Sequence, residues 1–171
     1  MLFLGFEGLL RTGELFSLWC ENLVVICGHL VVRLIQTKTG QQFGADQVVV
    51  IKSRIVVAVM NKFLGKLQLG DLLLCRYPAA ARQDSQQLLE FFDLGNCAFG
   101  WYSCRRGGAS ELFRRTGSME YTLIQGRWAN SRIARLHIET GLAECVSFSV
   151  APVQQRLFSL FAPRLQAYIG A

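Results

Sequence analysis

The chain has 171 residues and a net charge of +6, from 18 basic and 12 acidic side chains. Its hydrophobic fraction of 51% can fill a core, and its charged fraction of 18% is low, so some apolar surface should remain for a partner. No apolar run reaches the roughly 20 residues that a membrane-spanning helix needs, and the apolar start Met1 to Leu10 lacks the basic segment of a signal peptide.

The six cysteines are spread along the chain and no pair has Cys-x-x-Cys spacing. This pattern disfavours a zinc site and indicates free thiols in a reducing compartment. We therefore expect an intracellular protein, in the cytoplasm or at the membrane periphery, without metal or cofactor. The length favours one domain over residues 1–171.

The first half of the chain predicts many short strands. Short apolar runs bounded by glycine or polar residues are typical of strands, and runs that are apolar at every position indicate burial on both faces. The predicted strands are Leu15–Trp19, Leu23–Cys27, Leu30–Ile35, Val48–Ile51, Ile55–Met60 and Leu72–Cys75.

Helical periodicity begins after these runs. Asp84 and Gln87 have the spacing of a capping box, and the helix that they begin should end at Gly95. Asn96 can cap a second helix over Cys97 to Cys104, which Gly107 and Gly108 would stop.

The last third predicts a strand meander followed by a helix. Met119–Ile124 and the alternating segments around Leu136 and Phe148 have strand periodicity, and residues 153–171 form an amphipathic helix interrupted by Pro163. The helix is interpreted as a membrane or partner contact, or as the closing helix of the domain. The fold class expected is α+β and β-rich: an antiparallel sheet or partly open barrel packed against two or three helices.

Cys97 is the candidate nucleophile. A thiol at the first position of a helix capped by Asn96 would lie beside unpaired N–H groups, which favour the thiolate. A base is also needed, and the sequence offers only His29 and His137. The alternative is structural, because cysteine is often buried and each histidine has a simple surface interpretation.

The residues Asn96, Cys97, Cys104, Arg105 and Gly107 resemble the NC box of lecithin retinol acyltransferase-like proteins, in the NlpC-type papain-like superfamily. The resemblance covers roughly residues 13 to 110 and implies a papain-like fold. It also implies a thiol acyltransferase or hydrolase that acts on acyl lipids through Cys97, oriented at the helix start by Asn96.

The chain departs from that family at its histidines. Asn22 stands where the catalytic histidine is expected, and Arg33 stands where a second histidine is expected. His29 through another register, or His137 in the unpermuted order, would have to serve as the base. A catalytically inactive member of the superfamily is the remaining interpretation.

A second hypothesis is a non-enzymatic, basic interaction domain. The net charge of +6 and the surplus apolar content favour an acidic or apolar partner. The partners expected on this hypothesis are RNA, an anionic membrane, a protein assembly or a second copy of the chain. The cluster Arg105, Arg106, Arg114 and Arg115 is interpreted as a solvated face.

Overall fold

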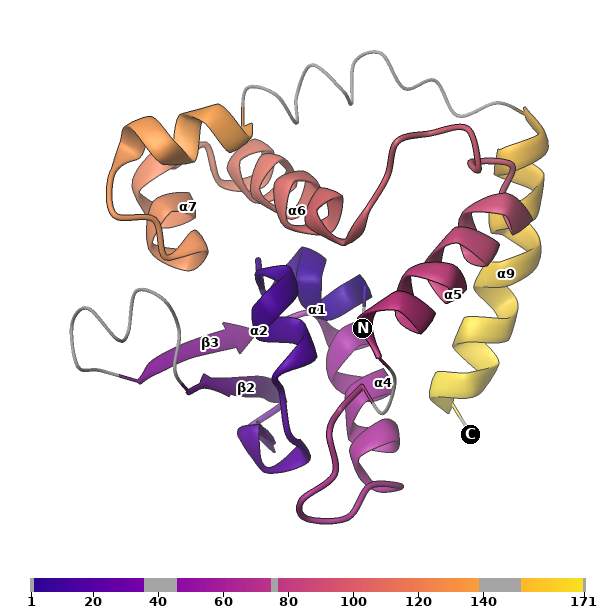
Figure 1. Cartoon of the computed structure of the whole chain (residues 1–171), viewed down its shortest axis with the longest axis horizontal. Helices are drawn as coiled ribbons and strands as arrows, with labels where there is room; N and C mark the ends of the chain where they lie inside the picture. Colours follow the sequence, from indigo (N-terminus) through magenta and orange to yellow (C-terminus); the bar gives the residue numbers. More distant parts are fainter. Residues whose placement is uncertain (1, 36–45, 75–76, 139–151, 171) are drawn as a thin grey trace.

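The structure is a computed structural model that describes residues 2–35, 46–74, 77–138 and 152–170. The fold is α+β, as expected, but helices outweigh strands in the described part of the chain. Its sheet has three antiparallel strands in the order β1-β2-β3 (Figure 1). They are β1 (Leu23–Ile26), β2 (His29–Leu34) and β3 (Gln47–Ile51), which confirms three of the predicted strands.

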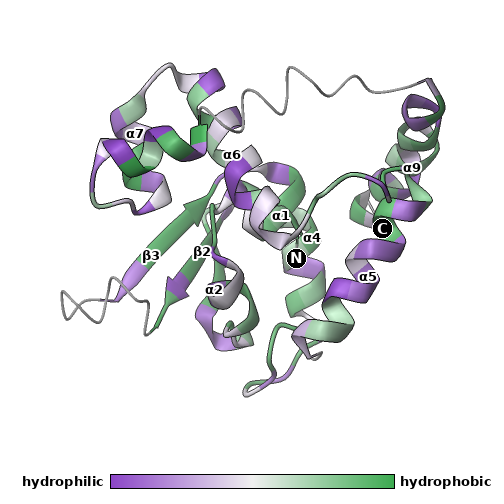
Figure 2. Ribbon diagram, turned by 45° about the horizontal axis from the view of Figure 1, so that its top comes forward, coloured by the Kyte–Doolittle hydropathy of each residue, from purple (hydrophilic) through white to green (hydrophobic). Residues whose placement is uncertain are grey.

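The sheet buries one face. Leu30 and Val32 of β2 are fully buried, whereas Val24, Val48 and Val50 on the opposite face are 41 to 57% exposed. Cys27 and Gly28 join β1 to β2 with φ values of 48° and 71°, as in the two-residue turns that match strand twist. The strands are mostly hydrophobic along their length in Figure 2, because apolar side chains occupy both faces.

Two apolar runs predicted as strands are helices. The run from Leu15 overlaps α2 (Thr12–Phe16), and Ile55–Met60 lies within α4 (Arg54–Leu64). In α4 the buried side chains are Val56, Val57 and Met60, a helical spacing that β-branched residues had obscured. The predicted strand Leu72–Cys75 is also wrong as far as it is described: Leu72 forms only an isolated bridge with Trp19 of the segment before η1 (Cys20–Asn22).

The middle helices differ from the prediction at both ends. Helix α5 (Pro78–Phe91) begins at Pro78, which suits a first helical position, so Asp84 lies inside the helix rather than at its cap. Helix α6 (Trp101–Thr116) begins after Cys97 and continues through Gly107 and Gly108. Those glycines lie where α6 packs closely against α1 (Leu2–Glu7) rather than at a helix end. A Cβ on Gly108 would lie 2.0 Å from the Phe6 carbonyl oxygen, so this position needs glycine.

The predicted meander is wrong where it is described. Residues 119–126 form α7 (Met119–Gly126), and residues 131–138 are also helical. The predicted strand around Phe148 lies outside the described residues. The C-terminal helix is confirmed as α9 (Pro152–Gly170), which continues through Pro163, and its role as a membrane or partner contact stays a prediction.

The buried side chains form two hydrophobic clusters. One joins the inner face of the sheet to α1, α2 and α4. The other joins α6 to the segment that contains Trp128, Ala134 and Ile138, and Leu9 is its contribution from the N-terminal part of the chain. Helices α5 and α9 pack on one another through stacked Phe92 and Phe158, on the side of α4 away from the sheet (Figure 1). None of the described helices is long and apolar enough to cross a membrane.

Candidate nucleic-acid interface

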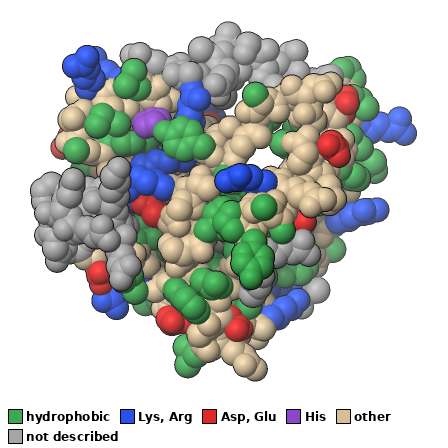
Figure 3. Space-filling view, in the orientation of Figure 1, with side chains coloured by type: hydrophobic (Ala, Val, Ile, Leu, Met, Phe, Trp, Pro, Cys, Tyr) green, Lys and Arg blue, Asp and Glu red, His purple; other side chains and the backbone are tan. Residues whose placement is uncertain are grey.

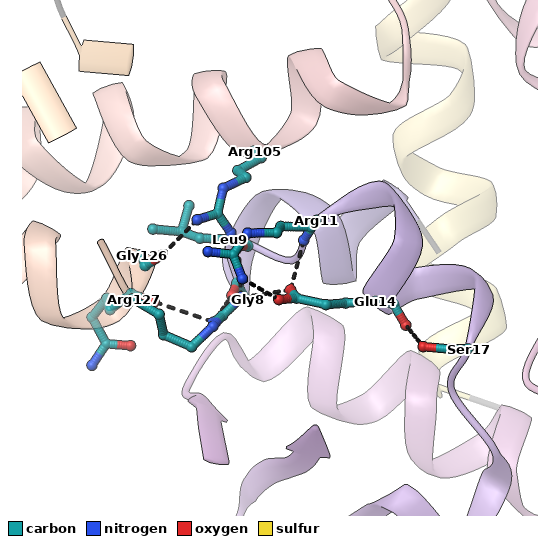
Figure 4. A network of polar contacts seen from close by, with 9 residues as sticks. Gly8, Leu9, Arg11, Glu14, Ser17, Arg105, Gly126 and Arg127 are labelled. Atoms are coloured by element: carbon teal, nitrogen blue, oxygen red, sulfur yellow. Dashed lines mark hydrogen bonds and ion pairs between the residues drawn. The ribbon is translucent and has the colours of Figure 1, made fainter. Parts of the chain in front are cut away.

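Three arginines from distant parts of the sequence converge beside the N-terminal helices (Figure 4). Arg11 immediately precedes α2, Arg105 lies in α6, and Arg127 is the C-cap of α7. We call these three residues and Glu14 the arginine cluster. Its members come together because α1 packs against α6 and α6 packs against α7.

Arg105 is buried, with 2% of its surface exposed. Its guanidinium donates hydrogen bonds to the carbonyl oxygens of Leu9 and Gly126, and lies 4.8 Å above the ring of Trp128. These carbonyl oxygens accept hydrogen bonds from both terminal nitrogens of the guanidinium but carry no full negative charge. Burial therefore lowers the pKa of Arg105 to about 10, and the positive charges of Arg127 and Arg11 act in the same direction.

Arg127 is nearly as buried, and it has a charged partner. Its Nη2 lies 2.7 Å from Oε2 of Glu14, and each side chain is 8% exposed. The same guanidinium donates to the carbonyl oxygens of Gly8 and Leu9 at 3.3 and 3.1 Å. Its Nε is buried without a hydrogen-bond partner among the described residues. Burial lowers the pKa of Arg127, although the charge of Glu14 opposes this effect.

Glu14 holds two arginines at once. It occupies the third position of α2 and accepts a 2.7 Å hydrogen bond from the backbone N–H of Arg11, the arrangement of a capping box. Its other oxygen accepts from Nη1 of Arg11 at 2.7 Å. The carboxylate thus fixes Arg11 and Arg127 relative to one another, with 33% of the Arg11 side chain still exposed.

The backbone under the cluster is unusual at two residues. Leu9 and Arg127 have φ values of 48° and 54°, in the left-handed region that costs a residue with a side chain about 1 to 2 kcal/mol. The Leu9 carbonyl accepts from both Arg105 and Arg127. Strained backbone that is held by such contacts is typical of functional sites.

The arginine cluster has a net charge of +2, because three guanidiniums face one carboxylate. Among the described groups of the cluster positive charge exceeds negative charge, and such an excess favours binding of an anion. Guanidiniums bind the oxygens of phosphate through charge-assisted hydrogen bonds. The arrangement can therefore hold a phosphate group.

A tyrosine and a histidine lie at the edge of the arginine cluster. The hydroxyl oxygen of Tyr102 in α6 lies 3.2 Å from Nδ1 of His137, in the helical segment 131–138. The imidazole stacks on Trp128 with a centroid distance of 5.1 Å. Burial lowers the pKa of His137, and Arg105, Arg106 and Arg11 lower it further.

The predicted site residues are placed differently from the expectation. Cys97 and Asn96 lie in the connection before α6, whose N-cap is Gly100, so the predicted helix start at Cys97 is wrong. Nδ1 of His29 contacts the carbonyl oxygen of Cys27 in the β1–β2 hairpin, and His137 contacts Tyr102 and Trp128. These described contacts do not bring either imidazole to Cys97. A catalytic role for these four residues stays a prediction.

The sequence interpretation missed Arg11 and Arg127 altogether. It placed Arg105 in the NC-box pattern and on a solvated face, whereas Arg105 is among the most buried side chains. The available signal was Arg11 three residues before Glu14 at a helix start, together with a basic residue at Arg127 just after a glycine. Neither pattern reveals a site without the fold that joins them.

Comparison with known proteins identifies the fold. No protein-family model matches the sequence, and no curated protein matches it. Two solved structures of the XerH site-specific recombinase are similar to this chain. One is bound to its difH substrate before cleavage and is 15% identical, with a TM-score of 0.65 over 86% of this chain and 45% of the recombinase. The other is a post-cleavage complex with palindromic difH, with 15% identity, a TM-score of 0.63, and coverage of 86% and 44%.

This chain therefore spans less than half of the recombinase chains that it matches. At 15% identity the likeness establishes a shared fold. It overturns the resemblance to lecithin retinol acyltransferase-like and papain-like proteins, which rested on the short NC-box pattern. It also overturns the acyltransferase or hydrolase function and the expected lipid, membrane, RNA and protein partners, because the neighbours are recombinases that bind DNA.

Proposed function

We propose that this chain is a DNA-binding domain that holds a backbone phosphate of duplex DNA at the arginine cluster. The observation that carries the proposal is the net charge of +2 on largely buried side chains. A phosphodiester has one negative charge and oxygens that accept hydrogen bonds from guanidinium groups. Its binding would bring a negative charge beside these guanidiniums.

The wider surface supports the same partner. Lys and Arg side chains lie near an imidazole on the face of the molecule shown in Figure 3. The whole chain is basic, with a net charge of +6, which favours approach to a polyanion. The structural neighbours are recombinases in complex with their difH substrates, so the fold is compatible with a bound duplex.

The three arginines have different roles in this proposal. Arg11 is the most exposed of the three guanidiniums, so we assign it direct contact with phosphate. Carbonyl oxygens hold both Arg105 and Arg127, and Glu14 also holds Arg127. These two buried guanidiniums therefore supply a fixed positive field next to Arg11. Such preorganised groups need little rearrangement when the anion arrives.

Binding of a labelled duplex of about 30 base pairs, followed by fluorescence anisotropy at several salt concentrations, tests this function. We expect the logarithm of the affinity to fall linearly with the logarithm of salt concentration, because phosphate contacts release counterions. Arg11→Gln should weaken binding by about tenfold or more, because one charge-assisted hydrogen bond to phosphate is lost.

Arg114→Gln is the matched control. Like Arg11→Gln, it removes one positive charge, but from a side chain of α6 that is 67% exposed and paired with Glu111. Its effect on affinity should be much smaller than that of Arg11→Gln. Undetectable binding at low salt, equal losses in the two variants, or equal affinity for duplex RNA would contradict the proposal.

A further inference from the structure

The Tyr102 hydroxyl and the His137 imidazole form a hydrogen-bonded pair beside the arginine cluster. The hydroxyl oxygen lies 3.2 Å from Nδ1 and 3.4 Å from Nε2, and the two rings meet edge to face with centroids 5.7 Å apart. Tyr102 is 47% exposed, so the pair lies at the protein surface.

Trp128 fixes the imidazole from a second direction. The two rings stack at an interplanar angle of 24°, and the same indole carries the guanidinium of Arg105 at 4.8 Å. Trp128 is 7% exposed and belongs to the second hydrophobic cluster. His137 is therefore held at a set distance from the arginine cluster rather than on a free surface.

The charges that act on His137 are positive. Arg105 and Arg106 act from α6 and Arg11 acts from the segment before α2, while Tyr102 is the neutral titratable partner. Arg132 and Arg135 on its own helical segment are exposed. No carboxylate is among the described groups that shift its titration, and Glu14 is already bound by Arg11 and Arg127.

In the free protein this environment favours the neutral imidazole. A neutral imidazole offers one nitrogen as an acceptor, so the Tyr102 O–H donates to it. A bound phosphodiester would add a negative charge beside the same three arginines. That charge compensates the repulsion and favours the imidazolium, in which both ring nitrogens are donors.

We propose that the Tyr102–His137 pair is a proton-linked part of the phosphate site. When a phosphodiester binds, His137 takes up one proton from solvent. The resulting imidazolium keeps this proton and donates a hydrogen bond to the Tyr102 oxygen. The Tyr102 O–H then turns from the imidazole to a phosphate oxygen. This inference rests on the proposed function, because the anion that drives the proton uptake is the DNA phosphate.

Calorimetric titration of the full chain with the same duplex, in two buffers of different ionisation enthalpy, counts the protons taken up on binding. We expect net uptake of up to one proton near pH 7. The affinity should also rise as the pH falls from 8 to 6, by at most about tenfold per pH unit for a single proton.

His137→Gln should abolish both effects while duplex binding persists. The chain has only two histidines, so His29→Gln is a complete control and should behave like the wild type. Tyr102→Phe should keep the proton uptake and weaken binding severalfold at pH 6, because the imidazolium remains and the hydroxyl donor is lost.

Equal proton uptake by the wild type and His137→Gln would overturn this inference. So would salt-dependent duplex binding by the wild type without proton uptake, a result that would leave the proposed function intact. If the wild type binds no duplex at low salt, both proposals fail together.

Discussion

Arg127 and Glu14 face one another across 2.7 Å with 8% of each side chain exposed, although 113 positions separate them in the sequence. Glu14 is thus the carboxylate that faces Arg127 inside the protein, and it also pairs with Arg11. Removal of one partner from a buried ion pair leaves the other charge uncompensated, which is far more costly than loss of a surface pair.

Glu14→Gln should therefore lower the free energy of unfolding by about 3 to 5 kcal/mol, measured by urea denaturation. The control is Glu111→Gln, which breaks the exposed pair with Arg114 and should have a much smaller effect. A double variant, Glu14→Gln with Arg127→Met, should lose less than the sum of the two single variants. Additive losses would show that the pair is not coupled.

Gly108→Ala should destabilise the packing of α1 on α6. The new Cβ would lie 2.0 Å from the Phe6 carbonyl oxygen and 2.7 Å from Leu9 Cδ2, so the two helices must separate. We expect a loss of about 3 kcal/mol in thermal or urea unfolding, at the upper end for an overpacked site. Gly13→Ala in α2 meets nothing within 4 Å and should not destabilise the protein. A stable Gly108→Ala variant would contradict the close crossing.

The stability of the free protein should depend on pH through His137. Its pKa in the folded protein lies below the ordinary histidine value of 6.5, so the unfolded chain binds the proton more readily. The contribution of the neutral imidazole is present above pH 6.5 and is lost as the pH falls from there toward the folded pKa. Urea denaturation between pH 8 and 5 should show this loss in the wild type and a smaller one in His137→Gln. Identical pH profiles for the two proteins would refute it.

Ser118→Ala should destabilise α7 through its N-cap. The Ser118 Oγ accepts a 3.1 Å hydrogen bond from the backbone N–H of Tyr121, and loss of such a cap costs about 1 kcal/mol. Ser85→Ala, inside the exposed face of α5, removes a hydroxyl that contacts only the Arg82 carbonyl within the same helix. Its effect on urea denaturation should be close to zero, and comparable losses in both variants would argue against the cap.

The sheet could be read from the sequence, whereas most helices before α5 and after α6 could not. Its three strands were predicted because they are short apolar runs bounded by glycine or polar residues. The expected burial on both faces was wrong, because Val24, Val48 and Val50 are exposed. The α4 segment contains four β-branched or apolar residues in a row at Ile55–Ala58, and only burial at Val56, Val57 and Met60 reveals its helical face. That information lies in the packing of α4 against the sheet, which no local pattern carries.

The candidate site was missed for a related reason. Asn96 and Cys97 formed a familiar local pattern, so the prediction placed chemistry there. The arginine cluster has no local pattern, because Arg11, Arg105 and Arg127 become neighbours only through tertiary contacts of α1, α6 and α7. The long-range charge compensation that defines the cluster is a property of the folded chain.

The Leu9 carbonyl oxygen accepts from Arg105 and from Arg127, which reach it from 96 and 118 positions away. One peptide group near the start of the chain thus binds two guanidiniums from its second half. A partly folded molecule, in which the first helix has detached, would keep its arginines but lose their alignment. Recognition of an anion here would then depend on the docking of the N-terminal segment against α6 and α7.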